Sequence, residues 1–380
     1  MTRIEANLPG EGFARITTND GVITKVERDG PERPEVAFAA PGLVDIQING
    51  FAGVDFSAAD LEVDAAISVL PTLWATGVTS FCPTLITNSI ERLERNFRVL
   101  EKARAASPDF ALSVPVYHLE GPYLSPGPSH GAHDPHWMRA PSWDEFDRLQ
   151  RAAGGNIGIV TLAPELPGAL DFIRRARAAG VRVAISHTDG KPEDIHDAIR
   201  AGATLSTHLG NGCPEMIHRH LAPLWAQLAS DALFASIICD NFHLPSDVVR
   251  VIYGMKGPDR CLLVTDAVHV AQLAPGRYSL VGTDIDLLES GKVVRSDGGS
   301  LSGSALSLDR AVRNFMDLAG ASLRQAVQAA STVPARFLDH PSACRQVVYG
   351  QPANLILFHE DAVGLRIEET LLHGETRYPR

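Results

Sequence analysis

VRVAISHTDGKPEDIHDAIRAGATLSTHLGNGCP, residues 181–214, is the stretch from which the rest of the chain can be interpreted. It contains two short apolar runs, Val181–Ser186 and Ala203–Thr207. A histidine follows each run, His187 after the first and His208 after the second. Runs of this length and composition predict buried β-strands, so each histidine is expected to stand just beyond a strand end.

A helical pattern from Pro192 to Ala201 lies between the two runs and stops before Gly202. Strand, helix and strand in this order predict one βαβ unit, in which the two strands are parallel. Parallel neighbours end at the same edge of a sheet, so both imidazoles should emerge there together. Either histidine alone would more simply finish a strand, but the matched pair favours metal ligands.

The same alternation continues along most of the chain. Eight apolar runs separated by helical patterns predict a parallel sheet, and eight such units predict a (β/α)8 TIM-type barrel. The strand candidates are Val44–Asn49, Val78–Pro83, Val114–Leu119, Gly158–Leu162, Val181–Ser186, Ala203–Thr207, Ala235–Cys239 and Leu262–Thr265.

Capping residues predict where two helices begin, and one strand-like segment predicts an insertion into the barrel. Asn88 and Ser142 each precede a glutamate by three residues, the spacing of a capping box, and so predict helix starts. The segment 276–295 is strand-like and predicts a β insertion into the barrel. Helices are expected to resume over residues 305–318 and 323–330.

Both ends of the chain read as short strands. Residues 13–17 and 22–27 flank the turn Asn-Asp-Gly and predict a hairpin, and residues 353–359 and 363–372 show a similar pattern. Neither end carries enough apolar sequence to fold alone. We therefore expect residues 1–42 and 345–380 to pair into one small β-sandwich domain, with the barrel spanning residues 43–344.

Composition limits the functional classes. The chain has 380 residues and a formal net charge of −11 with no basic run, which argues against a nucleic-acid partner. No segment has the character of a signal peptide or a membrane span. The five cysteines are scattered without a CxxC pair, which predicts reduced thiols and a cytoplasmic protein.

Side chains just after the strands are the candidate site residues. Glu120, His187 and His208 form a set of two nitrogens and one oxygen, which suits one divalent metal ion per chain. Zinc fits this set best, and iron, manganese or cobalt are alternatives. Asp266 follows the last strand and would face the same centre, where a carboxylate can take a proton from water and deliver it to a leaving group.

Other polar residues near these strand ends have different interpretations. Gln47 and Asn49 are amides and therefore poor zinc ligands, which argues against a second metal beside strand one. Strand alternation predicts that His118 points to the opposite side from its neighbours and is a packed histidine. His269 is close to Asp266 in sequence, and its role stays open.

Seven stretches together resemble the N-acetylglucosamine-6-phosphate deacetylase family of the amidohydrolase superfamily. They occur in order over nearly the whole chain: PGLVDIQINGFAGVDF (41–56), HLEGPYL (118–124), GAH (131–133), SHT (186–188), THLGNG (207–212), LVTDA (263–267) and LSGSALSLDRAVRN (301–314). The resemblance implies a (β/α)8 barrel with a small β-sandwich formed by both chain ends.

The resemblance also implies roles for individual residues. It gives Glu120, His187 and His208 as metal ligands and Asp266 as general base and acid, with His133 helping to place the acetamide. It implies a substrate-binding group comprising Ala132, His133, Asn211, Gly212, Arg219, His243 and Leu301. It further implies a homodimer, an amino sugar phosphate as substrate, and hydrolysis of N-acetylglucosamine 6-phosphate to glucosamine 6-phosphate and acetate.

One loop departs from the family pattern. Relatives read Gly-Arg-Glu-Pro-Gly around the phosphate arginine, whereas this chain has His218-Arg219-His220 followed by Leu-Ala. The alternatives are an amidohydrolase acting on another N-acyl sugar phosphate or a cyclic amide, or a catalytically silent sugar-phosphate-binding barrel. The intact ligand set with Asp266 argues against silence, because a binding protein needs neither an open metal site nor a base.

Overall fold

The computed structural model describes residues 1–297 and 300–379, and its centre is an eight-stranded parallel sheet. Each strand pairs in parallel with the next, in the order β14-β13-β12-β11-β10-β9-β8-β5. The strands are β5 (Leu43–Ile48), β8 (Val78–Ile86), β9 (Tyr117–Glu120), β10 (Ile157–Leu162), β11 (Arg182–Ile185), β12 (Ala203–Ser206), β13 (Phe234–Ile237) and β14 (Cys261–Leu263). All eight predicted strands are therefore present, and the TIM-type barrel is confirmed.

The first and last strands meet at a short seam. A single parallel bridge joins Ile48 to Ala267, and the backbone N–H of Asp266 donates to Gln47 O at 3.0 Å. Asp45, which is fully buried, accepts hydrogen bonds from the Thr265 hydroxyl at 2.6 Å and from its backbone N–H. A buried carboxylate thus joins the two strands where the sheet ladder is thinnest.

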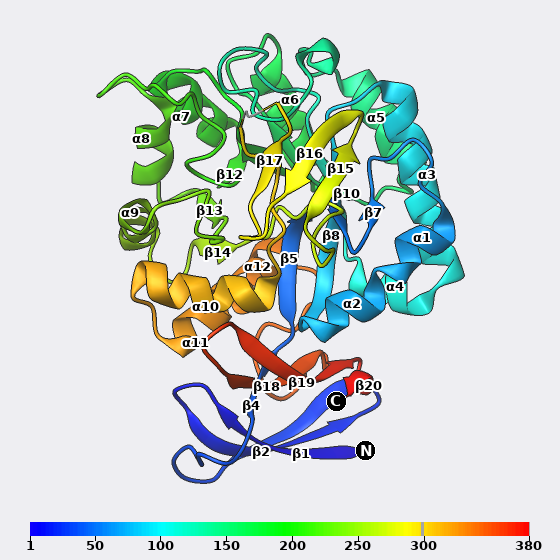
Figure 1. Cartoon of the computed structure of the whole chain (residues 1–380), viewed down its shortest axis with the longest axis vertical. Helices are drawn as coiled ribbons and strands as arrows, with labels where there is room; N and C mark the ends of the chain where they lie inside the picture. Colours follow the sequence, from blue (N-terminus) through cyan, green and yellow to red (C-terminus); the bar gives the residue numbers. More distant parts are fainter. Residues whose placement is uncertain (298–299, 380) are drawn as a thin grey trace.

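Helices surround the barrel (Figure 1). They are α1 (Val63–Ser68), α2 (Leu70–Ala75), α3 (Ile90–Ala106), α4 (Pro108–Ser113), α5 (Trp143–Ala152), α6 (Ala169–Ala178), α7 (Pro192–Ala201), α8 (Pro223–Ala229), α9 (Ser246–Lys256), α10 (Leu308–Ala319), α11 (Leu323–Ala330) and α12 (Thr332–Leu338), with a 3₁₀ turn at Pro135–Trp137. Ser142 caps α5 as predicted, accepting from Glu145 N. The start of α3 was placed one residue early, because Ser89 rather than Asn88 accepts the capping bond, from Arg92 N.

A seven-stranded sheet formed by both chain ends lies beneath the barrel, at the end where β5 begins (Figure 1). Its strands are β1 (Thr2–Leu8), β2 (Gly12–Asn19), β3 (Val22–Arg28), β4 (Phe38–Pro41), β18 (Leu355–Glu360), β19 (Leu365–Leu372) and β20 (Glu375–Pro379). The two ends join where β4 pairs with β18. The exact domain limits at residues 42 and 345 stay a prediction.

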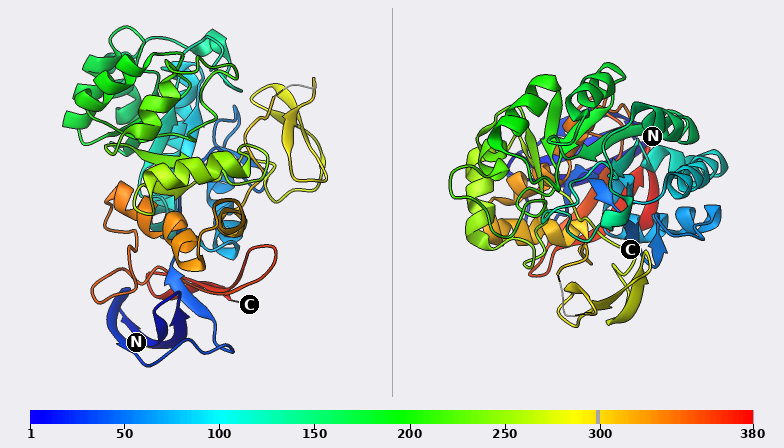
Figure 2. Two further views of the ribbon diagram at one scale, coloured as in Figure 1. Left: turned by 90° about the vertical axis from the view of Figure 1, so that its left-hand side faces the viewer. Right: turned by 90° about the horizontal axis from the view of Figure 1, so that it is seen from above.

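The predicted β insertion is also present. It forms a three-stranded antiparallel sheet of β15 (Gly276–Leu280), β16 (Thr283–Leu287) and β17 (Val293–Arg295), which projects from the barrel (Figure 2). Strands β6 (Gly50–Phe51) and β7 (Val54–Asp55) form a small hairpin after β5. No helix in the described part of the chain is long and apolar enough to cross a membrane.

Candidate active site

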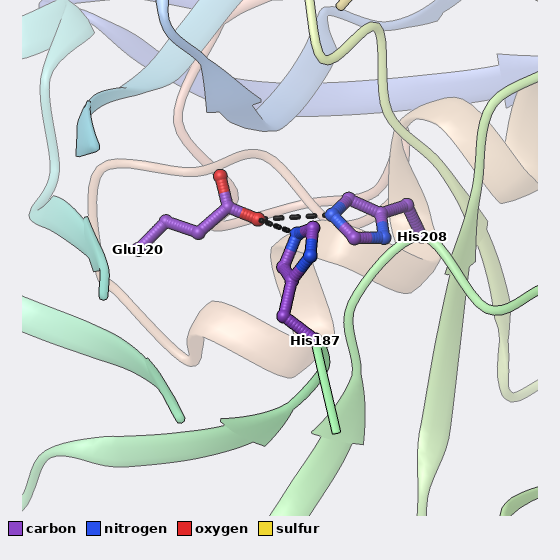
Figure 3. A group of neighbouring side chains, drawn as sticks. All are labelled: Glu120, His187 and His208. Carbon is purple, nitrogen blue, oxygen red and sulfur yellow. Dashed lines mark hydrogen bonds and ion pairs between the residues drawn. The ribbon is translucent and has the colours of Figure 1, made fainter. Parts of the chain in front are cut away.

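Three buried side chains meet at the carboxyl ends of the central strands (Figure 3). Glu120 is the last residue of β9, and His187 and His208 lie just beyond β11 and β12. Glu120 Oε1 lies 2.9 Å from His208 Nε2 and 3.5 Å from His187 Nε2. One ligand atom from each residue lies within 4.8 Å of the others, so the three can share one ion.

The outward-facing nitrogens of the two histidines are held in place by other groups. His187 Nδ1 lies 2.9 Å from the backbone oxygen of Ser129, which can only accept, so Nδ1 carries the proton. In the neutral imidazole, His187 Nε2 then carries the lone pair; this atom is buried 3.5 Å from Glu120 Oε1 and makes no hydrogen bond to a described residue. His208 Nδ1 lies 3.3 Å from Ser186 Oγ. A buried unpartnered imidazole nitrogen beside a carboxylate fits a divalent metal site.

The backbone at these strand ends is in an unusual conformation. His187, His208 and Asp266 have positive φ angles of 48°, 31° and 49°. Side-chain-bearing residues adopt this left-handed region at a cost, and such residues cluster at functional sites. The turn lets each side chain point over the barrel mouth instead of continuing the strand alternation.

Asp266 is held by one of its two carboxylate oxygens. Gln47 Nε2 and Asn49 Nδ2 donate to Asp266 Oδ1 at 3.0 and 2.7 Å. Asp266 Oδ2 makes no hydrogen bond to any residue in ranges 1–297 and 300–379. Burial, together with the negative charge of Glu120, raises the pKa of Asp266 to about 6. Asp266 is thus an oriented carboxylate with one free oxygen and an affinity for protons above the ordinary value.

The pKa of Glu120, the carboxylate in the ligand cluster, is displaced in the opposite direction from that of Asp266. Burial acts to raise the pKa of Glu120, but its contacts with His187 and His208 outweigh burial and hold the pKa well below its ordinary value. Glu120 therefore stays ionised beside Asp266, which accepts protons more readily. Two carboxylates with pKa values displaced in opposite directions can take different roles at one site.

His133 comes from the loop that follows β9 and packs edge-on against His187. The ring centroids are 4.5 Å apart, and His133 Nδ1 lies 2.9 Å from Thr87 Oγ1. Burial, with the neighbouring His187 ring, lowers the pKa of His133 to about 3. His133 is therefore neutral at physiological pH, and its Nε2 atom is available for a ligand. Ala132, just before it, is exposed.

The other predicted substrate-binding residues lie at different distances from the ligand cluster. Asn211 donates through its backbone N–H to His208 O at 2.9 Å. Gly212 packs so closely on Ser186 that a Cβ atom would lie 1.9 Å from Ser186 Oγ, which leaves room only for glycine. These contacts fix the Asn211-Gly212 segment beside the two metal-ligand strands.

His243 and Leu301 lie in segments next to Asp266. His243 Nδ1 is 2.6 Å from Asp240 Oδ2, and His243 lies near enough to act on the pKa of Asp266. Leu301 forms an antiparallel β-bridge with Val294. It lies three residues before Ser304, whose backbone N–H donates to Asp266 O.

Arg219 is the exception among the predicted site residues. It is exposed, and within residues 1–297 and 300–379 it makes no hydrogen bond or ion pair.

Several residues near the site were missed or misassigned from sequence. Ser129 and Thr87 orient His187 and His133, but an isolated serine or threonine in a loop carries no distinguishing signal. His118 is packed as predicted, with its ring nitrogens bonded to Ile46 O and Thr161 Oγ1. It does not point away from Glu120, however, because residues two apart on β9 share a face. His118 therefore lies beneath the metal ligand.

A comparison with protein-family models decides the family. The model described as "Amidohydrolase family" matches residues 38–376, which is most of the chain. The chain belongs to the amidohydrolase family. This assignment agrees with the barrel, the terminal sheet and the buried ligand cluster described above.

Relatives of this amidohydrolase include named deacetylases. The chain is 33% identical over 346 residues to N-acetylglucosamine-6-phosphate deacetylase of Bos taurus, covering 88% of this chain and 82% of that one. It is 30% identical over 364 residues to N-acetylgalactosamine-6-phosphate deacetylase of Escherichia coli O157:H7, covering 94% and 92%. The structure of N-acetyl-D-glucosamine-6-phosphate deacetylase from Mycobacterium smegmatis superimposes with a TM-score of 0.89, at 27% identity over 99% of this chain and all of that one.

Proposed function

We propose that this amidohydrolase removes the acetyl group from a 6-phosphorylated N-acetylhexosamine, with N-acetylglucosamine 6-phosphate as the first candidate substrate. The observation that carries the proposal is the buried Glu120–His187–His208 set with Asp266 oriented beside it. The named activities of the most similar proteins supply the substrate class. The products would be glucosamine 6-phosphate and acetate.

Glu120, His187 and His208 would hold one divalent ion, for which zinc suits the ligand set best and iron, manganese or cobalt are alternatives. When bound, such an ion polarises the acetamide carbonyl and lowers the pKa of water. Asp266 Oδ2 accepts the proton of the attacking water as the new carbon–oxygen bond forms. The same oxygen then delivers the proton to the sugar nitrogen as the carbon–nitrogen bond breaks.

His133 is suited to the carbonyl oxygen of the acetamide. The Thr87 hydroxyl can donate to His133 Nδ1, which places the imidazole proton on Nε2. A neutral imidazole can then donate to the oxygen on which negative charge develops. Because the His133 ring packs against His187, this donor stands next to the metal-ligand cluster.

The remaining predicted residues would bind the sugar and its phosphate. Asn211 and Gly212 lie beside His208 and would line one side of the sugar pocket. The backbone near Ala132 and Leu301 would line the rest of it. Arg219 and His243 are the candidates for the phosphate, since arginine suits a dianion. A phosphate held remotely positions the acetamide at the reacting groups.

A second candidate substrate is N-acetylgalactosamine 6-phosphate. The E. coli relative named for that sugar matches this chain over 94% of its length. The His218-Arg219-His220 loop also lacks the glycines and the proline of the family pattern, so the candidate phosphate loop differs from that of the family. The two sugars differ only in the orientation of one hydroxyl, and the metal-site chemistry would be the same.

We infer a homodimer formed through α8, α9 and the loop before α8, which lie together at one side of the barrel (Figure 1). Large apolar side chains are exposed there, and isolated monomers rarely expose such a group. They are Met216, Leu221, Trp225, Val248, Val251 and Met255. Arg219 lies in the same loop, so a second copy docked here would bring Arg219 toward a neighbouring site. A cytoplasmic location remains our prediction, and all five cysteines are free thiols.

A substrate panel tests the proposed function. Purified protein reconstituted with zinc should release acetate from N-acetylglucosamine 6-phosphate or N-acetylgalactosamine 6-phosphate, and much less from the unphosphorylated sugars. Absence of acetate from all four compounds would reject deacetylation of amino sugars. Equal rates with and without phosphate would retain the deacetylase but reject the phosphate site.

A further inference from the structure

The loop after β9, residues 121–134, is fastened over the site by the side chain of Asp189, which lies in the loop after β11. Asp189 Oδ2 accepts a hydrogen bond from Ser125 Oγ at 2.5 Å. Asp189 Oδ1 accepts from the backbone N–H of Ser129 at 3.2 Å. Gly127 passes so close that a Cβ atom would lie 2.2 Å from Asp189 Oδ2. The loop therefore wraps around this carboxylate.

The fastened loop supplies the outer partner of a metal ligand. The Ser129 carbonyl that accepts from His187 Nδ1 belongs to the residue whose N–H is held by Asp189. The loop also binds the strand end directly, since Ser125 N donates to His187 O at 3.0 Å. One carboxylate thus fixes both ends of the five-residue span that orients the His187 ring.

Asp189 is itself held from the other side. Glu165, in the loop after β10, accepts from Asp189 N at 2.8 Å and from Thr188 Oγ1 at 2.6 Å. Three loops are thereby linked in one chain of bonds, from Glu165 through Asp189 and Ser129 to His187. Asp189 does not belong to the Glu120–His187–His208 group, so its effect on the metal site is indirect, and this chain of bonds provides a route for it.

We propose that Asp189 is a positioning residue that orients His187 for metal binding through the Ser129 carbonyl; the proposal rests on the proposed metal site. A metal-binding histidine depends on the partner of its second ring nitrogen for its tautomer and its direction. Here that partner is the Ser129 carbonyl, and Ser129 lies in an irregular loop outside the sheet, so no strand pairing fixes its position. The hydrogen bond from Ser129 N to Asp189 Oδ1 fixes it instead.

Zinc affinity of the variant proteins tests the proposal. Asp189→Ala removes both loop contacts, Ser125→Ala removes one, and Asp171→Asn is the control because Asp171 is exposed on α6 and forms an ion pair with Arg174 on the same helix. In chelator competition at a temperature well below unfolding, Asp189→Ala should bind zinc about 10- to 100-fold more weakly than wild type. Ser125→Ala should fall between, and Asp171→Asn should equal wild type.

A spectroscopic measurement separates orientation from general destabilisation. The visible absorption of cobalt-substituted protein reports ligand geometry, and it should change in Asp189→Ala and Ser125→Ala but not in Asp171→Asn. If both variants bind zinc within twofold of wild type with an unchanged cobalt spectrum, Asp189 is only structural, whatever the melting temperature. Should Asp189→Ala fail to fold, Ser125→Ala decides by the same criteria. Wild-type protein that binds no zinc would instead reject the metal site.

Discussion

Asp266→Asn is the substitution that most cleanly separates the chemistry of this site from its shape. Gln47 and Asn49 both donate to Asp266 Oδ1, and an asparagine side chain keeps an oxygen at that position. The new amide nitrogen then takes the place of Oδ2, the oxygen that has no hydrogen bond to a described residue. The variant should fold, keep the Glu120–His187–His208 cluster, and lose only the proton acceptor.

The size of the effect follows from the role assigned to Asp266 Oδ2. General acid–base catalysis contributes about 10²- to 10⁴-fold in rate, or about 3–5 kcal/mol of the activation barrier. Asp266 acts twice, once on water and once on the leaving nitrogen. We therefore expect kcat for acetate release to fall by at least about a hundredfold, with KM changed little.

The assay is acetate release by metal-loaded protein, with metal content measured on the same samples. Asp45→Asn is the matched control, because Asp45 is also a buried carboxylate, on β5, but accepts from Thr265 and bonds to no member of the Glu120–His187–His208 cluster. The control should retain most of its turnover. If Asp266→Asn keeps its metal and its kcat lies within tenfold of wild type, Asp266 is not the base, and His133 or His269 becomes the next candidate.

Three further outcomes follow from particular contacts. Arg219→Ala should weaken kcat/KM for the 6-phosphorylated sugar by about 2–4 kcal/mol while leaving the unphosphorylated sugar nearly unaffected, and an equal loss on both would show that Arg219 does not bind phosphate. Lys256→Met should lower the free energy of unfolding by about 3 kcal/mol, measured in urea, because the buried ammonium donates to the carbonyls of Gln227, Ser230 and Leu233; a loss below 1 kcal/mol would contradict this. Burial raises the pKa of Asp45 to about 7, so between about pH 4 and pH 7 the folded state keeps a proton that the unfolded state has released. The contribution of Asp45 to the unfolding free energy is therefore fully present below pH 4 and is lost as the pH rises through 7. Relative to Asp45→Asn, wild type should therefore lose about 3–4 kcal/mol of unfolding free energy between pH 4 and pH 8, and a constant difference would refute this pKa.

The barrel could be predicted from sequence because its signals are local. A buried parallel strand is a short apolar run, and all eight runs became strands of one sheet. The start of α3 was harder, since Asn88 and Ser89 are both good capping residues and only the fold selects between them. Strand β20 was missed because ETRYP has neither an apolar run nor a clear alternation.

The metal-ligand set was predictable for a related reason. Parallel strands end at one edge, so the residue that ends β9 and those that follow β11 and β12 had to come close together. Details that depend on loops were not predictable. The left-handed backbone at His187 and the loop that brings Ser129 to it both arise from contacts between segments far apart in sequence.

The direct test of the central claim is a zinc titration of metal-free protein, with acetate release from N-acetylglucosamine 6-phosphate and from N-acetylgalactosamine 6-phosphate measured at each point. The described residues contain one set of three strong ligands, which predicts no activity without zinc, a linear rise to about one zinc per chain, and a plateau beyond it. Activity in the metal-free protein, or activity that requires a second equivalent bound near Gln47 and Asn49, would contradict the account.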